Sequence, residues 1–490
     1  MAVKKEGIIL KKVLSWPVFL GLQILTSLAF IFFVFKLGVI PTKYIAIIIA
    51  FVVILCLVTF FLMKPKNQKE SAKNLIGKIV SILISIVMVV GSGYIAKGDS
   101  ALGNISGANK QTNTISAIVL KNNSAKSLED LKGKTFGTNL STDEYLNEAM
   151  SEAQKTIGEL KTKDYKDFES LATALYKENV DAILMDEAYR TIVEGKYDTF
   201  EEDTRVVWEY NYEKELKDFS KNVDVTKDVF TIYLSGIDTR GKVSTVSRSD
   251  VNMLVTVNPK TKQILMTSIP RDYYVTLANK GKKDKLTHAG IFGVENSVKT
   301  VEGFMGIDIN YYAKVNFTSL VTMVDALGGI EVYSDKTLSG TWTNKGVTIK
   351  KGYNHMDGET ALAFSRERYS YASGDNHRVH NQQEVLKGMI NKMISPAIIT
   401  NYNNVLSAIE GSFETNMSAS EITSLIKMQI NDMASWDILQ TQLSGSGKRM
   451  YGGALMPNNN LYYMIPDENS VNKCKSYIEK MTKGEKVTVK

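Results

Sequence analysis

The chain has 490 residues, of which 44% are hydrophobic and 23% charged, a composition that excludes a mainly disordered or collagen-like protein. The net charge of +7 is unevenly distributed: the first 78 residues carry eleven lysines and two glutamates, or +9, which leaves −2 for residues 79–490. The basic excess therefore belongs to the N-terminal segment, and no basic domain remains to bind nucleic acid. The only two cysteines, Cys56 and Cys474, cannot build a disulfide framework or a zinc site.

Three apolar segments near the N-terminus predict transmembrane helices. They are Pro17–Phe35, Tyr44–Met63 and Ile79–Ala96, and each is long enough, or nearly so, to cross a hydrocarbon layer of about 30 Å. Lysines are frequent before the first segment and between the second and third, whereas only Lys36 and Lys43 lie between the first and second. The positive-inside rule then predicts a multi-pass protein of the cell membrane with a cytoplasmic N-terminus and extracellular C-terminal domains.

The rest of the chain shows two successive α/β patterns. The predicted division is residues 1–97 for the cytoplasmic tail and three transmembrane helices, 98–112 for a linker, 113–220 for a small accessory α/β domain and 221–490 for a C-terminal α/β domain. Tyr210–Lys221 is predicted to be a charged helix, and Val251–Asn258 with Gln263–Ile269 a hairpin. The predicted fold class is thus α/β, with helices layered on a mixed central sheet in the C-terminal domain.

Arginine is scarce in this chain but clustered. Only nine of the 59 basic residues are arginines, yet six of them fall between residues 240 and 378: Arg240, Arg248, Arg271, Arg366, Arg368 and Arg378. The planar guanidinium fork binds carboxylates and phosphates through two hydrogen bonds, so the cluster predicts an anion-binding site. Arg366 and Arg368 would share a face if their segment is extended. Surface arginines in unrelated salt bridges are the alternative.

Two carboxylates accompany these arginines. Asp238 follows a predicted strand, where sites of open α/β sheets usually lie, and Asp250 is two residues from Arg248, so that both project to one face of an extended strand. Magnesium characteristically takes one or two protein carboxylates together with substrate phosphates. The pair therefore predicts a Mg²⁺ site, with simple pairing to neighbouring arginines as the alternative.

These residues together resemble the LytR–CpsA–Psr (LCP) family. The resemblance rests on five ordered motifs, Gly236–Arg240, Arg248–Met253, Ile269–Asp272, Phe364–Arg368 and Asp375–Gln383, and covers about residues 228–395. The three spans and accessory domain resemble the streptococcal capsule-locus members. Separately, Ser127–Lys134 with Val180–Leu184 resembles half of a bacterial extracellular solute-binding protein, which favours a scaffold or partner-docking role over ligand capture.

The LCP resemblance implies a specific set of site residues. Asp238 and Asp250 would hold Mg²⁺, and the pyrophosphate of a polyprenyl-linked substrate would be gripped by Arg248, Arg271, Arg366, Arg368, Arg378 and Gln382. Asp250, Arg271, Arg366 and Arg368 would act in the reaction itself. The general base stays open among Asp250, Asp272 and Asp375.

The resemblance also implies a reaction and its partners. A glycopolymer, here capsular polysaccharide, would pass from undecaprenyl pyrophosphate to peptidoglycan with formation of a phosphodiester. The expected partners are the polyprenyl pyrophosphate lipid, the glycopolymer, peptidoglycan, the membrane and the capsule synthesis machinery. Two alternatives remain open: a phosphatase that releases polyprenyl phosphate to water, and a non-catalytic lipid-pyrophosphate receptor that regulates capsule synthesis.

Overall fold

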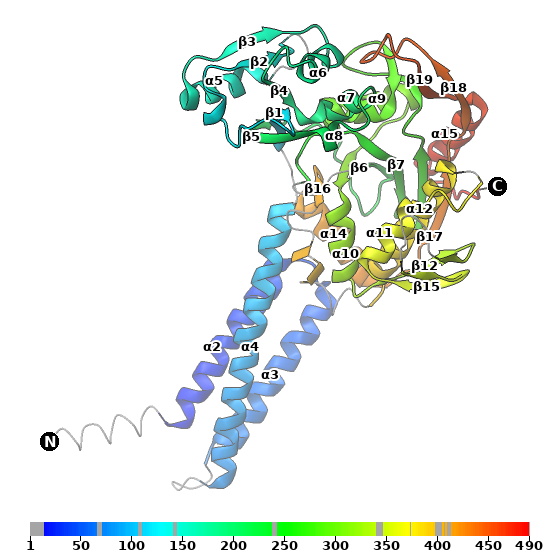
Figure 1. Cartoon of the computed structure of the whole chain (residues 1–490). Helices are drawn as coiled ribbons and strands as arrows, with labels where there is room; N and C mark the ends of the chain where they lie inside the picture. The colour runs from blue at the N-terminus through cyan, green and yellow to red at the C-terminus, as the bar shows by residue number, and fades with distance from the viewer. Residues whose placement is uncertain are drawn as a thin grey trace, which may run out of the picture. The chain divides into compact units, whose positions relative to one another are not determined.

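The computed structural model describes residues 14–65, 71–105, 110–140, 145–237, 243–339, 346–372, 374–396, 404–405, 407–408 and 413–489. It consists of two compact units. The first comprises Met1–Ser106, Asn391–Glu410 and Ser418–Ser435, and the second comprises Gly107–Ile390, Gly411–Met417 and Trp436–Lys490. Three long apolar helices and two larger sheets confirm the predicted α/β fold class (Figure 1). The finer division into four segments stays a prediction.

The first unit contains three helices long and apolar enough to cross a membrane: α2 (Trp16–Leu37), α3 (Thr42–Met63) and α4 (Ala72–Ile105). Large apolar side chains such as Leu25 and Phe61 point outward, whereas the polar Gln23 and Thr59 are fully buried. The Thr59 hydroxyl donates a 2.8 Å hydrogen bond to Oε1 of Gln23. Apolar surface outside and paired polar groups inside are typical of a helix bundle in lipid.

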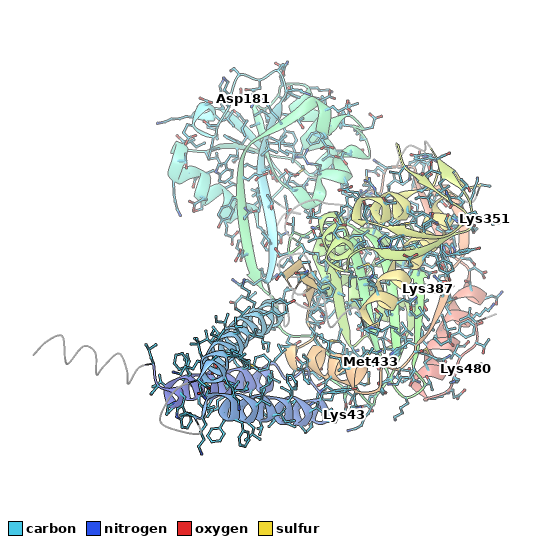
Figure 2. The ribbon with its side chains drawn as sticks, turned by 90° about the horizontal axis from the view of Figure 1, so that it is seen from below. Lys43, Asp181, Lys351, Lys387, Met433 and Lys480 are labelled. Atoms are coloured by element: carbon cyan, nitrogen blue, oxygen red, sulfur yellow. The ribbon has the colours of Figure 1, made fainter. Side chains whose placement is uncertain are left out.

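A helix from the C-terminal part of the sequence also belongs to this unit. It is α14 (Ala419–Asp432), and its first turn is closed by a capping box between Ser418 and Glu421. Nζ of Lys43, at the start of α3, donates a hydrogen bond to the carbonyl oxygen of Asn431. Figure 2 labels Lys43 and Met433 at the place where α3 and α14 meet. The start of α3 therefore contacts α14.

The N-terminal part of the second unit is a five-stranded sheet in the order β3-β2-β4-β1-β5. Its strands are β1 (Lys110–Leu120), β2 (Thr135–Thr138), β3 (Lys161–Asp164), β4 (Ala182–Asp186) and β5 (Thr204–Glu215). Its helices are α5 (Leu146–Ile157), α6 (Phe168–Tyr176), α7 (Arg190–Glu194) and α8 (Phe200–Asp203), with 3₁₀ turns η1 (Glu129–Leu131) and η2 (Glu187–Tyr189). The predicted helix over Tyr210–Lys221 is wrong, because β5 extends to Glu215 along the whole length of β1.

The C-terminal part of the second unit contains a six-stranded mixed sheet in the order β16-β11-β6-β7-β8-β17. Its strands are β6 (Phe230–Ile237), β7 (Ser249–Asn258), β8 (Gln263–Ile269), β11 (Tyr311–Val315), β16 (Phe413–Thr415) and β17 (Asp437–Gln442). The pairs β11–β6 and β17–β8 are parallel, and the other pairs are antiparallel. The predicted hairpin of β7 and β8 is confirmed.

Helices cover both faces of this sheet (Figure 1). On one face, Tyr233, Leu254 and Leu265 form a buried core with α9 (Val294–Met305) and α15 (Glu468–Thr482). On the other face lies α12 (Asp375–Met393), whose Gln383 donates a 2.9 Å hydrogen bond to Ser268 on β8. The remaining elements are α10 (Phe317–Ala326), α11 (Gly358–Arg366), η3 (Leu286–Phe292), β9 (Tyr274–Thr276), β10 (Lys283–Lys285), β12 (Ile330–Ser334), β13 (Leu338–Ser339), β14 (Thr348–Ile349), β15 (Gly352–Met356), β18 (Gly445–Met450) and β19 (Leu461–Pro466).

The two sheets of the second unit share packing and hydrogen bonds. Thr112 on β1 donates its amide to the carbonyl oxygen of Ser244 and accepts the amide of Val246. Val246, Ile291 and Met456, which follow in the sequence, are buried in the same hydrophobic cluster as α6 and α7. The accessory part is therefore built into the second unit as a packed layer.

Candidate active site

The site lies at the edge of the C-terminal sheet where β6 and β8 end and β7 begins. Here Gly236 pairs with Val251 and Ile237 with Ser249, so Asp250 is the extra residue of a β-bulge. Bulges re-aim side chains and are common beside active sites. Position 236 requires glycine, because a Cβ atom there would lie 2.7 Å from the Cβ of Val251.

Asp250 is the meeting point of three side chains. One carboxylate oxygen lies 3.0 Å from Nη1 of Arg271 and 4.0 Å from Nη2 of Arg248. The other oxygen accepts a 3.0 Å hydrogen bond from the hydroxyl of Thr287. The predicted proximity of Arg248, Asp250 and Arg271 is thus present in the structure.

A buried polar network holds this bulge from below. The hydroxyl of Ser249 lies 2.8 Å from that of Ser235 and 3.2 Å from that of Tyr233. Tyr233 also donates to Oδ1 of Asn252, whose amide returns a 2.9 Å hydrogen bond to the carbonyl oxygen of Ser249. Burial raises the pKa of Tyr233 to about 12, so its hydroxyl stays a donor at neutral pH. The backbone between Arg248 and Asp250 is therefore fixed by four buried side chains.

The arginines keep the Asp250 carboxylate charged. Burial of this group would raise its pKa, but the positive charges of Arg271, Arg248 and Arg378 hold the pKa below its ordinary value. Three guanidinium groups surround the Asp250 carboxylate, and Lys285 offsets the neighbouring carboxylate of Asp272, so the positive charge around Asp250 is in excess. Such a centre attracts a phosphate or pyrophosphate group, which can accept paired hydrogen bonds from arginine.

Arg378 reaches this centre from α12, and two amides anchor the helix. Gln383 donates to the Ser268 hydroxyl at 2.9 Å and to the Thr441 carbonyl oxygen at 2.8 Å, which attaches α12 to the end of β8. Asn381 donates a 3.1 Å hydrogen bond to the carbonyl oxygen of Phe364 in the last turn of α11. The ends of α11 and β8 are therefore both held beside the helix that carries Arg378.

Arg366, Arg368 and Gln382 are the predicted residues that the structure does not join to Asp250. Arg366 ends α11, so the extended segment under which Arg366 and Arg368 would share a face is not formed at this residue; the guanidinium carbon of Arg366 lies 4.4 Å from the centre of the Phe317 ring. Arg368 donates a 2.7 Å hydrogen bond to the hydroxyl of Tyr369. Within the described residues, no hydrogen bond or ion pair links these two arginines or Gln382 to Asp250. Their role in substrate binding stays a prediction.

Asp238 and Arg240 lie outside the described residues, as does the side chain of Asp375. Asp250 by itself fits a hard divalent cation, because it presents an ionised carboxylate. Among the described side chains, no group of three or more His, Cys, Asp or Glu gathers to hold a metal ion. A Mg²⁺ ion here would depend on Asp250 and on oxygens from the substrate.

Several residues of the site carry no motif signal in the sequence. Thr287 on η3 binds Asp250. Nζ of Lys285 lies 2.9 Å from one carboxylate oxygen of Asp272, and the other oxygen lies 3.5 Å from Nε of Arg271. From the accessory part, Glu194 on α7 is close enough to Arg248 to interact with its charge. Burial raises the pKa of Glu194, although Arg190 and Arg248 oppose this shift. These partners come from tertiary packing, which spacing in the sequence could not reveal.

The arginine cluster lies at one edge of a mixed sheet that is covered by helices on both faces, and this part of the chain can be compared with known protein families. A family model described as the LytR–CpsA–Psr family matches residues 192–480, and one described as NMT1/THI5-like matches residues 106–217. The chain belongs to the LytR–CpsA–Psr family, as the motifs predicted.

Curated relatives agree with that assignment. A protein of Bacillus anthracis named polyisoprenyl-teichoic acid–peptidoglycan teichoic acid transferase TagU is 36% identical over 253 residues, which cover 51% of this chain and 79% of the relative. A protein of the same name from Enterococcus faecalis is 36% identical over 225 residues, covering 45% and 72%. Among solved structures, B. subtilis TagV is 29% identical over 53% of this chain and 99% of that one, with a TM-score of 0.44.

Proposed function

We propose that the chain is a membrane-anchored phosphotransferase that moves a glycopolymer from a polyprenyl (undecaprenyl) pyrophosphate carrier to peptidoglycan. The observation that supports this most is the Asp250 centre with Arg248, Arg271 and Arg378 at the sheet edge. The names of the relatives supply the substrate class, since they are called polyisoprenyl-teichoic acid–peptidoglycan transferases. The resemblance to the capsule-locus members favours capsular polysaccharide as the polymer, whereas the names of the relatives favour teichoic acid.

The chemistry would be a displacement at phosphorus. A sugar hydroxyl of the wall attacks the phosphorus that carries the polymer, the bond from that phosphorus to the bridging oxygen breaks, and polyprenyl phosphate leaves. Arg248, Arg271 and Arg378 would neutralise the charge that spreads over the phosphate oxygens. Mg²⁺ held by Asp238 and Asp250 would supply further charge neutralisation when bound. The proton of the attacking hydroxyl needs a carboxylate acceptor, for which Asp272 and Asp375 remain candidates beside Asp250.

The sheet itself offers a place for the lipid. Ile232 and Leu234 on β6, with Val251 and Val255 on β7, lie on the face away from the Tyr233 core; Ile232 pairs with Val255, Leu234 with the buried Met253, and Val251 with Gly236. All four side chains are half-buried, although they are apolar and lie in the central strands. Incompletely covered apolar side chains beside a phosphate-binding edge suit a polyprenyl chain attached to pyrophosphate.

We also infer that the C-terminal domains are extracellular and the N-terminus cytoplasmic. Residues 416–418, which separate β16 from α14, are too few to cross a membrane, so α14 and the C-terminal sheet lie on one side. The contact of α14 with Lys43 supports the same side for the connection between α2 and α3. The lysine-rich N-terminus and the connection between α3 and α4 then face the cytoplasm.

The test uses the full chain in lipid nanodiscs with a polyprenyl pyrophosphate-linked saccharide, Mg²⁺ and a peptidoglycan-derived acceptor. We expect polyprenyl phosphate to be released and sugar phosphate to appear on the acceptor. EDTA should prevent the formation of both products. Arg271→Ala should lower the transfer rate by about 10²–10³-fold, the usual loss when a charge-stabilising donor is removed. Arg449→Ala is the matched control, since Arg449 instead bonds the carbonyl oxygen of Asn460.

The outcomes separate the alternatives. Release of polyprenyl phosphate without capture on the acceptor would favour the phosphatase. Tight binding of the lipid with no turnover would favour the receptor. Parallel assays with capsular and teichoic acid donors identify the polymer.

A further inference from the structure

A cavity of about 440 Å³ lies between the accessory sheet and the C-terminal part of the second unit. Part of its lining consists of polar side chains of β1 and β4 that are hydrogen-bonded to one another. Nε2 of Gln111 donates to Oδ1 of Asn113 at 3.0 Å, and Nδ2 of Asn113 donates to Oδ2 of Asp186 at 2.6 Å. All three residues are less than 10% exposed. A buried row of amides and a carboxylate gives this part of the lining a fixed pattern of hydrogen-bonding groups.

Aromatic and charged side chains also line the cavity. Tyr145 and Tyr189 from the accessory part line the cavity together with Phe292 from the C-terminal part, and the rings of Tyr189 and Phe292 meet edge-on with their centres 6.4 Å apart. Lys214, Lys280 and Lys299 line the same cavity; Nζ of Lys280 lies 4.9 Å from the centre of the Phe292 ring, and Nζ of Lys299 lies 2.6 Å from Glu295.

This combination of groups indicates what kind of molecule would fit. Aromatic rings pack against the apolar faces of sugar rings, and amide and carboxylate oxygens accept hydrogen bonds from sugar hydroxyl groups. Lysines attract an acidic group. The volume lies within the usual range for small-ligand sites.

The cavity is close to the arginine centre in two ways. The short 3₁₀ helix η3 binds Asp250 through Thr287 at its start and lines the cavity with Ile291 and Phe292 at its end. At about 2 Å per residue in a 3₁₀ helix, these ends are roughly 10 Å apart. On the accessory side, α7 follows directly after the cavity residue Tyr189 and ends at Glu194, which senses the charge of Arg248.

Glycine keeps η3 against the active-site strand. A Cβ atom on Gly290 would lie 2.6 Å from the carbonyl oxygen of Ser247 and 2.7 Å from the amide nitrogen of Ser249. The cavity and the arginine centre are therefore linked by η3, which packs tightly against the residues that precede Asp250.

We propose that this cavity is a subsite for an acidic saccharide unit of a glycan bound at the arginine centre. The assignment depends on the transferase function proposed above, and it gives the accessory part a role in holding glycan. The acidic saccharide has two possible sources, the wall acceptor, whose acid is a carboxylate, and the polymer on the lipid carrier, whose acid is a carboxylate or phosphate.

Binding is measured first, on the full chain in nanodiscs, with cellobiuronic acid and its neutral counterpart cellobiose as probes. We expect the acidic disaccharide to bind at least tenfold more tightly. Lys280→Met should weaken its binding roughly tenfold, the scale of one charge-assisted hydrogen bond, and Lys299→Met should act in the same direction. Lys282→Met is the control, because this exposed lysine lies two residues from Lys280 but does not line the cavity. Equal binding of both disaccharides, or equal effects of Lys280→Met and Lys282→Met, would overturn the subsite.

Transfer kinetics then distinguish the two sources of the saccharide. A raised KM for the peptidoglycan acceptor in Lys280→Met assigns the subsite to the acceptor, whereas a raised KM for the lipid-linked donor assigns it to the polymer. Unchanged KM values for both substrates would contradict a place for this cavity in the reaction. If the wild-type chain binds the acidic disaccharide but transfers nothing, the proposed transferase fails while the saccharide site stands.

Discussion

Lys314 shows how a buried residue outside every motif is tied to the site. It lies on β11, is 6% exposed, and donates a 2.9 Å hydrogen bond from Nζ to the carbonyl oxygen of Thr245. Thr245 belongs to the segment that precedes Arg248 and forms a β-bridge with Thr112 of the accessory sheet. Lys314 is directly opposite Glu414 on β16. One ammonium group therefore holds the segment on which the arginine centre and the accessory contact both depend.

The Lys314 and Glu414 pair makes stability depend on pH. Burial lowers the pKa of Lys314 from 10.5, while the charge of Glu414 opposes the shift; burial raises the pKa of Glu414 from 4.5, while Lys314 opposes it. Because the pKa of Glu414 is raised, the folded state binds more protons than the unfolded state. The contribution of Glu414 to the free energy of unfolding is therefore fully present below pH 4.5 and is lost as pH rises through the folded-state pKa. The lowered lysine pKa has the opposite slope.

Lys314→Met removes the lysine, so that only the pH dependence caused by Glu414 remains in the free energy of unfolding. We expect its free energy of unfolding to fall more steeply between pH 5 and pH 8 than that of the wild type, with a loss of about 3–5 kcal/mol for the uncompensated carboxylate at the upper end. Thermal and urea unfolding of the full chain at four pH values measures this. The double variant Lys314→Met/Glu414→Gln should restore a shallow pH dependence. A single variant as flat as the wild type would show that the two groups do not titrate as a pair.

At the scale of elements, sequence patterns were reliable where local forces decide the structure. The β7–β8 hairpin follows from apolar alternation on both sides of a polar turn, and it forms as predicted. The stretch Tyr210–Lys221 was misread because its charges suggested a solvated helix. In the structure, β5 is an edge strand whose exposed face carries charges, and pairing with β1 from Lys110↔Glu215 to Leu120↔Thr204 determines it.

The site was predictable to a similar extent. Spacing placed Arg248 beside Asp250. That Arg271 and Arg378 belong to the same site was implied by the family resemblance. The bulge at Asp250 and its bond to Thr287 depend on pairing between distant segments, which no local pattern reports. Likewise, the extended segment that would give Arg366 and Arg368 a common face is not formed, because α11 continues through Arg366.

The packing of η3 against β7 gives a prediction for a single methyl group. Gly290→Ala would place Cβ against the backbone of residues 247–249 and move Thr287 away from Asp250. We expect a loss of about 1–3 kcal/mol in unfolding free energy, typical of overpacking, together with reduced transfer. Gly303→Ala, in the interior of α9 with nothing within 4 Å of its added Cβ, is the control and should stabilise by about 0.5–1 kcal/mol. Similar Tm values for the two variants would argue against the close contact.

At the scale of the whole molecule, the accessory part cannot be treated as removable. Its α6 and α7 share a hydrophobic cluster with Val246, Ile291 and Met456 of the C-terminal part. A chain that lacks residues 110–217 would expose these side chains and lose the hydrogen bonds of Thr112. We therefore expect residues 221–490 alone to unfold at a clearly lower temperature, or to aggregate, whereas residues 107–490 unfold cooperatively. Equal Tm values for the two forms would show that the shared core adds little stability.

The charge distribution along the whole chain predicts the orientation of the protein in the membrane. Thr42, at the start of α3, and Lys73, near the start of α4, are both exposed and lie at opposite ends of the bundle. In a background with Cys56 and Cys474 replaced by alanine, Thr42→Cys should react with a membrane-impermeant maleimide on intact cells. Lys73→Cys should react only after permeabilisation. The two sites are a matched pair, so unequal reactivity reflects side of the membrane rather than burial. The reverse pattern would place the arginine centre in the cytoplasm, away from peptidoglycan, and would end the transferase proposal at once.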